Sequence, residues 1–518
     1  MKRPLLLLVV AVSGAAVLSL ELLGTRLLGP FYGVSLFLWS ALISVTLAAL
    51  AVGYALGGRM ADRGASGTRL ATLLLAAGAW TLLAPVLRDP VLIVTDRRGL
   101  RVAVLVASLV LFFVPLALLG MVTPIAVRLR THSLADVGSS AGEIYAVSTL
   151  ASVGSALLTG FVLIPEVGAK RLLLLLGGLL VLTAALVFLA ERRRAPAAAA
   201  LLALLGVGGF WRATGPNPKR LPDLLMERQS AYGEIRVVNE GDDYRYLILD
   251  GGTHSLVRVG QWDSRHGYVA AAELVRHFFP RPGTMLTIGM GAGSLAKSYH
   301  QAGWAVDVAE IDPAIPAVAR RYFDLRPADA RITIADGRRF LAQPPAAGQP
   351  ARYDFIMIDA FGSSFVPFHL LSREAFALAA RRMTPDGVLA LNLITTSWDD
   401  ILARAAAATL KMSFTHVLAL PVGEPPNTLG NIVLLASNRP MTFPDETIPN
   451  PYAVVADEYL HWKVVEQNHS WDNRFEPNTD DAPVLTDDLS PVDLWGERVN
   501  LAVREDLHGY FKNRGLDW

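Results

Sequence analysis

Long apolar segments recur through the first two hundred residues of the chain. Six of them are long enough to cross the hydrocarbon core of a bilayer, which takes a helix of about 20 apolar residues. A shorter candidate, 196–211, would be a seventh. The six are Leu5–Gly24, Leu36–Gly57, Leu70–Leu87, Val102–Val127, Ile144–Ile164 and Leu172–Ala190. The pattern predicts a transmembrane helical domain of six or seven spans over residues 1–212.

After residue 212 the pattern changes to short apolar runs. Gly233–Asn239 and Arg245–Asp250 are typical of paired strands. From Met285 onward, short apolar runs alternate with helical stretches, which indicates a parallel sheet with helices on both faces. The expected boundaries are 213–225 for a linker, 226–283 for a small β-element, 284–500 for a Rossmann-like α/β domain and 501–518 for a C-terminal tail.

Charge divides the chain in the same place. Basic residues outnumber acidic ones up to residue 212, and the reverse holds after it, although the formal net charge is only +1. The second part has no basic run with interleaved aromatic residues, so we expect no nucleic-acid partner. The chain has no cysteine, and no His, Asp and Glu residues stand at a spacing typical of metal ligands, so we expect no metal.

A glycine-rich turn follows the apolar run Met285–Ile288. Its glycines are Gly289, Gly291 and Gly293, and a helical pattern begins directly after them. Glycines at this spacing let the backbone approach a ligand closely at the N-terminal end of a helix. Together with an acid about twenty residues on, at Glu310, the turn predicts a nucleoside-binding site.

Acidic residues end successive predicted strands. They are Glu310, Asp336 (followed by Gly337) and Asp359. Because the carboxyl ends of parallel strands meet at one edge of a sheet, we expect the three to converge on one crevice. Glu310 would bind ribose hydroxyls, Asp336 would accept from an adenine amino group, and Asp359 would face the reacting end. For each acid taken alone, a helix cap is the alternative.

These residues resemble the spermidine synthase (aminopropyltransferase) family, whose fold is a small β-domain followed by a Rossmann-like methyltransferase-type domain. The similarity covers roughly 230–493. Two stretches in the first part, 13–30 and 145–168, are similar to a subgroup with an N-terminal multi-pass membrane domain. The matching pieces are 246–251, the glycine turn, AEIDP at 309–313, ADGRRF at 335–340, YDFIMIDAF at 353–361, HLLSREAF at 369–376 and LTDDLSPVD at 485–493.

The resemblance implies a transferase of polyamine biosynthesis. In that family an aminopropyl group moves from the sulfonium of decarboxylated S-adenosylmethionine to an amine, without a metal. Catalysis is expected at Asp359 and Tyr268. Asp359 would also bind the cationic amine, together with Asp487 or Asp488. The nucleoside residues implied are Gly289, Gly291, Gly293, Glu310, Asp336, Gly337 and His254.

Two departures from the family pattern leave alternatives open. Gly362 stands where the family has its second acid, and His254 stands in place of the usual glutamine. A methyltransferase using S-adenosylmethionine itself is one alternative, with His254 or Arg265 meeting the carboxylate. The other is a non-catalytic polyamine or nucleoside sensor coupled to the membrane domain.

Location and partners follow from the same interpretation. We expect a multi-pass protein of the cell (inner) membrane, with the lipid bilayer and a small cationic amine as partners and a homodimer as one assembly. Arginines fall in several connections between spans and do not fix the orientation. The second part is expected in the cytoplasm, because sulfonium nucleosides are made there.

Overall fold

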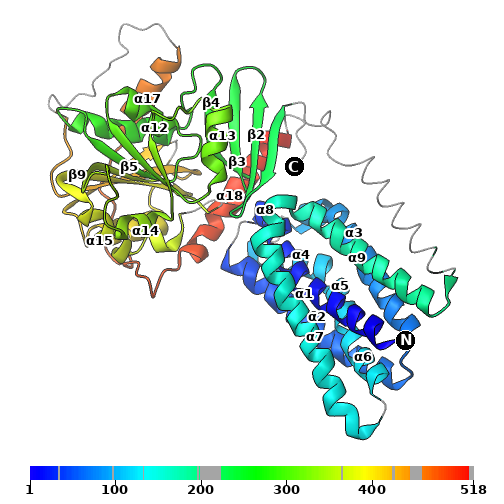
Figure 1. Ribbon diagram of the computed structural model, residues 1–518. Coiled ribbons are helices and arrows are strands. Elements are labelled where there is room, and N and C mark those ends of the chain that lie inside the picture. Colours follow the sequence, from blue (N-terminus) through cyan, green and yellow to red (C-terminus); the bar gives the residue numbers. More distant parts are fainter. Residues whose placement is uncertain are drawn as a thin grey trace. The chain divides into compact units, whose positions relative to one another are not determined.

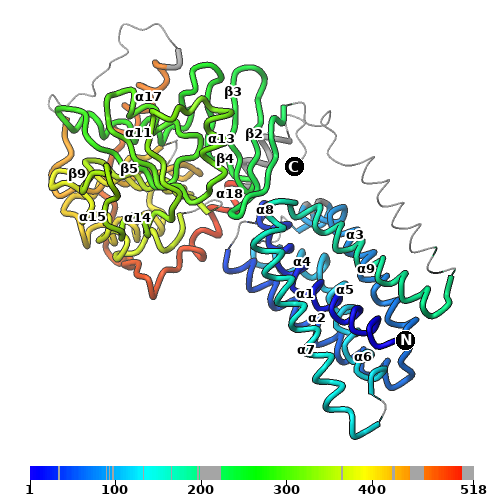
Figure 2. Tube along the Cα trace, viewed as in Figure 1, coloured from blue at the N-terminus to red at the C-terminus, as the bar shows by residue number. Residues whose placement is uncertain are grey.

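The computed structural model describes residues 1–32, 35–95, 99–131, 133–194, 196, 198, 223–362, 366–422, 426–443 and 458–512. The chain divides into two compact units: residues 1–222 with 228–234, and residues 223–227 with 235–518. Figure 1 shows the helices of the first, helical unit and the strands and helices of the second, sheet unit, and Figure 2 follows the same chain as a tube. The seventh candidate span lies outside the described residues, apart from positions 196 and 198, and only 223–225 of the expected linker are described.

Among its described residues, the helical unit contains six helices that are long and apolar enough to cross a membrane, which fits the predicted six or seven spans. Two of these stretches contain a π-helical turn, at Leu109–Phe113 and Thr159–Leu163. Some of the long stretches are divided into several labelled segments. The α-helical segments are α1 Arg3–Tyr32, α2 Leu36–Asp62, α3 Gly67–Thr95, α4 Leu100–Ser108, α5 Val114–Gly120, α6 Val122–Arg130, α7 Val137–Leu158, α8 Ile164–Val167 and α9 Ala169–Ala190.

Several polar groups inside the helical unit find partners on a neighbouring helix. Pro115 has no N–H, so the Leu111 carbonyl lacks its usual helical donor, and the Trp80 indole N–H donates to that carbonyl at 3.1 Å. Ser152 of α7 donates to the Gly14 carbonyl of α1 at 2.8 Å. Small residues and hydroxyls at such contacts are typical of membrane helix packing.

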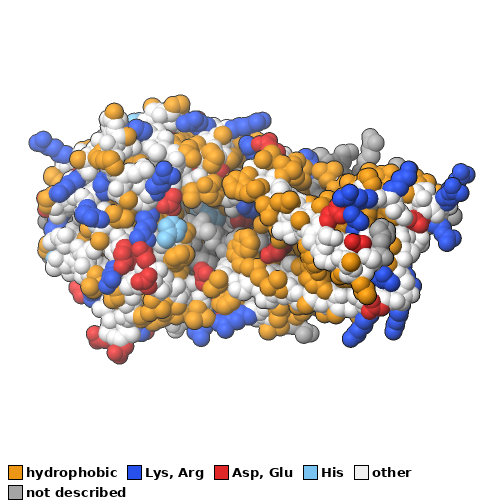
Figure 3. Space-filling view, turned by 60° about the horizontal axis from the view of Figure 1, so that its bottom comes forward, with side chains coloured by type: hydrophobic (Ala, Val, Ile, Leu, Met, Phe, Trp, Pro, Cys, Tyr) orange, Lys and Arg blue, Asp and Glu red, His pale blue; other side chains and the backbone are white. Residues whose placement is uncertain are grey.

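The surface of the helical unit is largely apolar. Large hydrophobic side chains stand exposed there, among them Leu47 (62% exposed), Leu150 (72%) and Phe161 (80%). Figure 3 shows hydrophobic side chains spread over this unit, on the right, with Lys and Arg gathered at one end of it. Such a surface suits lipid better than water.

The sheet unit begins with a four-stranded sheet in the order β1-β2-β3-β4. The tight turn between β3 and β4 has positive φ at both Asp250 (44°) and Gly251 (79°), the backbone that a two-residue hairpin requires. The strands are β1 Leu224–Gln229, β2 Glu234–Glu240, β3 Tyr244–Leu249 and β4 Gly252–Arg258.

A seven-stranded sheet follows, in the order β10-β11-β9-β8-β5-β6-β7. β5 to β9 pair in parallel, whereas β11 pairs antiparallel with both of its neighbours. The connection from β10 to β11 is too short for a parallel crossover, so the expected parallel sheet is mixed at this edge. The strands are β5 Thr284–Ile288, β6 Ala305–Glu310, β7 Arg331–Ile334, β8 Tyr353–Ile358, β9 Met383–Thr395, β10 His416–Val422 and β11 Gly430–Ser437.

Helices cover both faces of this sheet, which confirms the predicted Rossmann-like fold. Phe355 and Met357 of β8 pack into one core, and Ile356 and Ile358 pack into the other. The helices are α11 Gly267–Glu273, α12 Ser294–Gln301, α13 Ala314–Tyr322, α14 Gly337–Ala342, α15 Arg373–Arg381, α16 Ile401–Leu410, α17 Glu458–Asp472 and α18 Val492–Lys512. α18 continues across residue 501, the expected start of the tail.

The strand order reverses at β5. From β5 the chain moves outward through β6 to β7 and then returns to β8 on the other side of β5. In such sheets the crevice for a ligand lies beyond the carboxyl ends of the strands at this reversal. The predicted glycine turn and Asp359 follow the two strands that flank it.

Candidate functional site

Asp359 follows β8 at the strand reversal. Its backbone N–H donates to the Ile288 carbonyl at the end of β5 at 2.9 Å, which places it beside the glycine turn. Its carboxylate accepts two hydrogen bonds, from the Tyr268 hydroxyl at 3.0 Å and from Asn392 Nδ2 at 2.9 Å. Both donors are neutral. Burial dominates over these hydrogen bonds and raises the pKa of Asp359 to about 6.

Tyr268 of α11 reaches Asp359 through its hydroxyl, and the ring of its neighbour His266 lies against the Tyr268 ring. The two rings stack with centroids 5.6 Å apart. Burial raises the pKa of Tyr268 well above its usual range, so the hydroxyl remains a donor toward Asp359. Burial lowers the pKa of His266 to about 4, so this ring is neutral near pH 7. The structure thus brings together Asp359 and Tyr268, the two predicted catalytic residues.

Asn392 of β9 was missed by the sequence analysis. Its side chain is 1% exposed, and its Oδ1 accepts a hydrogen bond from Asn431 of β11 at 2.9 Å. That contact turns the other end of the amide, Nδ2, toward Asp359. The available signal was one polar residue within an apolar run, in the strand that pairs with β8.

The glycine turn packs closely between β4 and Asp359, the residue that follows β8. A side chain at Gly289 would meet the Asp359 backbone carbonyl, and one at Gly291 would lie 2.6 Å from Ser255 Oγ. Ser255 Oγ accepts the Ala292 N–H at 2.9 Å, so the small β-element supports the turn directly. All three predicted glycines have positive φ: Gly289 84°, Gly291 49° and Gly293 83°.

Glu310 ends β6 beside the glycine turn. Its carboxylate accepts the Met290 N–H of the turn at 3.2 Å and the Asp312 N–H at 2.9 Å. The side chain is 6% exposed, and burial raises its pKa to about 7. The structure therefore joins the predicted ribose-binding acid to the predicted nucleoside-binding turn.

Asp336 begins α14, and its two oxygens have different partners. Oδ1 caps the helix by accepting the Arg339 N–H at 2.9 Å. Oδ2 lies 3.0 Å from His369 Nε2, and this hydrogen bond is the main reason that the pKa of Asp336 lies below its usual range. A side chain at Gly337 would collide with Ile288 of β5, so glycine is required for α14 to start here.

Comparison with known proteins finds relatives of the sheet unit. A polyamine aminopropyltransferase of Vibrio vulnificus is 28% identical over 291 residues, which is 52% of this chain and 91% of that protein. The second half of this chain is related to the polyamine aminopropyltransferases. The expected resemblance to the spermidine synthase family is thereby confirmed, and with it the assignment to the transferases, whereas the subgroup with an N-terminal membrane domain stays a prediction.

Two further comparisons give a methyltransferase and a solved structure. An N-terminal histidine N-methyltransferase of Emericella nidulans is 31% identical over 191 residues, 33% of each chain. The crystal structure of a probable spermidine synthase from Corynebacterium glutamicum aligns with a TM-score of 0.40 at 19% identity, covering 52% of this chain and 96% of that one. No protein-family model matches the chain.

His254 and Arg265, the two residues expected to meet a donor carboxylate, pack against aromatic rings. The His254 ring meets the Phe361 ring edge-on with centroids 6.3 Å apart, so it lies beside the loop that follows Asp359. The Arg265 guanidinium lies over the Trp462 ring, 4.5 Å from its centroid. Among the described residues, no group of three or more His, Asp or Glu side chains is placed to hold a metal ion.

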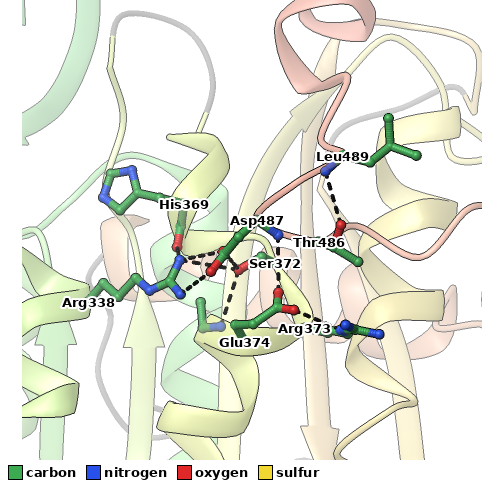
Figure 4. A network of polar contacts seen from close by, with 9 residues as sticks. Arg338, His369, Ser372, Arg373, Glu374, Thr486, Asp487 and Leu489 are labelled. Carbon is green, nitrogen blue, oxygen red and sulfur yellow. Dashed lines mark hydrogen bonds and ion pairs between the residues drawn. The ribbon is translucent and has the colours of Figure 1, made fainter.

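Asp487 and Asp488, expected near the amine of an aminopropyltransferase, have different surroundings. Asp487 accepts from Arg338 Nη1 at 2.6 Å and from Nη2 at 2.5 Å (Figure 4). The Arg338 guanidinium lowers the pKa of Asp487 to about 2. Asp488 is exposed. In the described part of the chain, the side chains bonded to the Asp359 carboxylate are Tyr268 and Asn392.

Proposed function

We propose that the chain is a membrane-bound, spermidine synthase-like aminopropyltransferase. It moves an aminopropyl group from decarboxylated S-adenosylmethionine to an amine acceptor. The observation that carries the proposal is Asp359: a carboxylate beside the glycine turn at the strand reversal, with neutral donors and a pKa of about 6. Such a group is ionised near pH 7 and can still accept a proton.

Each part of the donor has a candidate partner in the site. Glu310 binds the ribose hydroxyls, the backbone at Gly289, Gly291 and Gly293 approaches the nucleoside, and Asp336 accepts from the adenine amino group. In transfer, the neutral amine nitrogen attacks the aminopropyl carbon that is bound to the sulfonium sulfur. A C–N bond forms, the C–S bond breaks, and 5′-methylthioadenosine leaves with the electron pair on sulfur. The new ammonium passes a proton to Asp359, which Tyr268 and Asn392 hold in place.

Methyl transfer from S-adenosylmethionine is the second candidate function. The glycine at position 362 and the histidine N-methyltransferase relative favour it. In this case His254 would meet the carboxylate of the donor. Arg265 is less available for that role, because it is stacked on Trp462.

One experiment separates the candidates. The full chain, purified in detergent, is incubated with each sulfonium donor separately and with a panel of mono-, di- and triamines, and the products are read by mass. We expect the mass of one aminopropyl group to be added from the decarboxylated donor only. Addition of a methyl group from S-adenosylmethionine would establish the second function. Nucleoside binding without any product would establish a sensor.

We also propose that the six apolar helices hold the protein in the cell membrane, with the sheet unit in the cytoplasm, and that the chain assembles as a homodimer. The chain has no cysteine of its own, so a single Asp386→Cys change at an exposed position of the sheet unit gives a specific probe. We expect no labelling by an impermeant maleimide in intact cells and full labelling after lysis. Labelling of intact cells would contradict this orientation.

The homodimer is tested separately, by light scattering of the protein–detergent complex.

A further inference from the structure

The segment after α17 brings Asp487 to the N-terminal ends of α14 and α15 (Figure 4). Arg338 donates to both oxygens of Asp487, at 2.6 and 2.5 Å. Ser372 Oγ donates to Oδ1 at 2.6 Å, and the Asp487 backbone N–H donates to Glu374 at 3.1 Å. A two-point Arg–carboxylate contact fixes geometry more tightly than a single hydrogen bond. Asp487 therefore holds Arg338 in one orientation.

Arg338 extends this network toward the nucleoside end of the site. Its Nη1 also donates to the His369 backbone carbonyl at 3.1 Å. The His369 ring in turn places Nε2 3.0 Å from Asp336 Oδ2. A continuous chain of contacts thus runs from Asp487 through Arg338 and His369 to Asp336.

We propose that Asp487 and Arg338 are positioning residues that hold His369 against Asp336, and that His369 thereby orients the Asp336 carboxylate toward the 6-amino group of a purine nucleoside. The inference rests on the proposed function, because it takes Asp336 as the group that meets the nucleobase. It gives Asp487 a role in the nucleoside site in place of the amine-binding role expected from the sequence.

The chemistry of an ionised carboxylate accounts for the selectivity. Such a group only accepts hydrogen bonds, so it binds the amino group of adenine and repels the carbonyl oxygen of a 6-oxopurine. The side chains of Asp336 (32% exposed) and His369 (34% exposed) keep access to a ligand while bonded to each other. The His369 contact orients the carboxylate, and it is the first cause of the lowered pKa of Asp336.

The test compares two nucleosides that differ at one position of the base. The full chain in detergent is titrated by calorimetry with 5′-methylthioadenosine and with 5′-methylthioinosine, which has an oxygen in place of the amino group. We expect Asp487→Asn to weaken binding of the first by about fivefold, the scale of one hydrogen bond, and to leave the second unchanged. The donor KM should rise with kcat unchanged. Asp386→Asn removes the same charge at another exposed position and should change neither.

Two substitutions at His369 serve as the second arm, and they decide the matter if Asp487→Asn does not fold. His369→Gln keeps a donor for Asp336 and should retain most of the preference for the amino group. His369→Leu should lower the preference about fivefold, as Asp487→Asn does, because the carboxylate stays ionised but loses its orientation. Equal weakening for both nucleosides, or no change with either, would overturn the positioning role and leave the proposed function standing. Failure of the wild-type chain to bind either nucleoside would overturn both.

Discussion

Asp359 and Asp336 lie at the carboxyl ends of two strands of one sheet, yet their surroundings shift their pKa values in opposite directions. Among the described residues Asp359 has two hydrogen-bond donors, both neutral, and burial raises its pKa to about 6. Asp336 is partly exposed and pairs with His369, which holds its pKa below the usual range. The first carboxylate is suited to taking up a proton near neutral pH, and the second to remaining an acceptor. The fold places an acid at each strand end, and the partners of each acid decide its chemistry.

Glu310 shares one property with each of these two carboxylates. It resembles Asp359 in burial, with a pKa raised to about 7, and it resembles Asp336 in its expected role as a nucleoside acceptor. An acceptor with such a pKa makes nucleoside binding sensitive to pH. The predictions below test whether proton transfer and nucleoside binding can be separated among these three acids.

The largest effect is expected at the reacting end. Asp359→Asn keeps the shape of the side chain but cannot take a proton, so kcat should fall by roughly a hundredfold or more. Affinity for 5′-methylthioadenosine, measured by calorimetry, should stay within about twofold of wild type, because the nucleoside contacts lie elsewhere. Near-normal turnover would show that Asp359 takes no part in the chemistry. Loss of both turnover and nucleoside binding would show that proton transfer and nucleoside binding are not separate at this residue.

A smaller effect is expected for the ribose contact. Glu310→Gln replaces an ionised acceptor with a neutral one, and affinity for 5′-methylthioadenosine should fall about tenfold, the scale of a hydrogen bond to a charged group. Because the pKa of Glu310 is raised to about 7, wild-type binding should tighten as pH rises from 6 to 8. The Gln variant should lose this dependence. A wild-type affinity that is flat over this range would contradict the assignment.

Asn392→Leu should change the pH dependence more than the maximal rate. The hydrogen bond from Asn392 stabilises the ionised form of Asp359 and lowers its pKa. Without it the acidic limb of the rate profile should move to higher pH by up to about one unit, the free energy of one hydrogen bond. Asn431→Ala, one contact further away, should move the limb less. A limb that stays in place in both variants would show that Asn392 does not act on the base.

The smallest effect concerns stability. The folded-state pKa of Asp359 is raised above the value of an unfolded chain, so its contribution to stability is present below the unfolded pKa and is lost as pH rises through about 6. The melting temperature of Asp359→Asn relative to wild type should therefore increase between pH 4 and pH 7 and level off above that. A difference that is constant with pH would indicate that Asp359 is not destabilised by burial.

Local patterns predicted much of this molecule, and long-range pairing set the rest. Apolar runs, glycines and strand-end acids lie within short stretches, so the six long helices, the glycine turn and the edge position of Asp359 could be predicted. The pairing of Arg338 with Asp487 joins residues 149 positions apart, and the contact of His369 with Asp336 spans 33. No local pattern shows such pairs. The same holds for Asn392, whose role depends on its place in the strand beside β8.

The central claim is that Asp359 accepts the proton during aminopropyl transfer. The most direct measurement is kcat as a function of pH, from pH 5 to 8, with the decarboxylated donor and saturating amine. The account predicts an activity that rises with pH through a single ionisation near pH 6, the pKa of Asp359. A rate that is independent of pH over this range would contradict it.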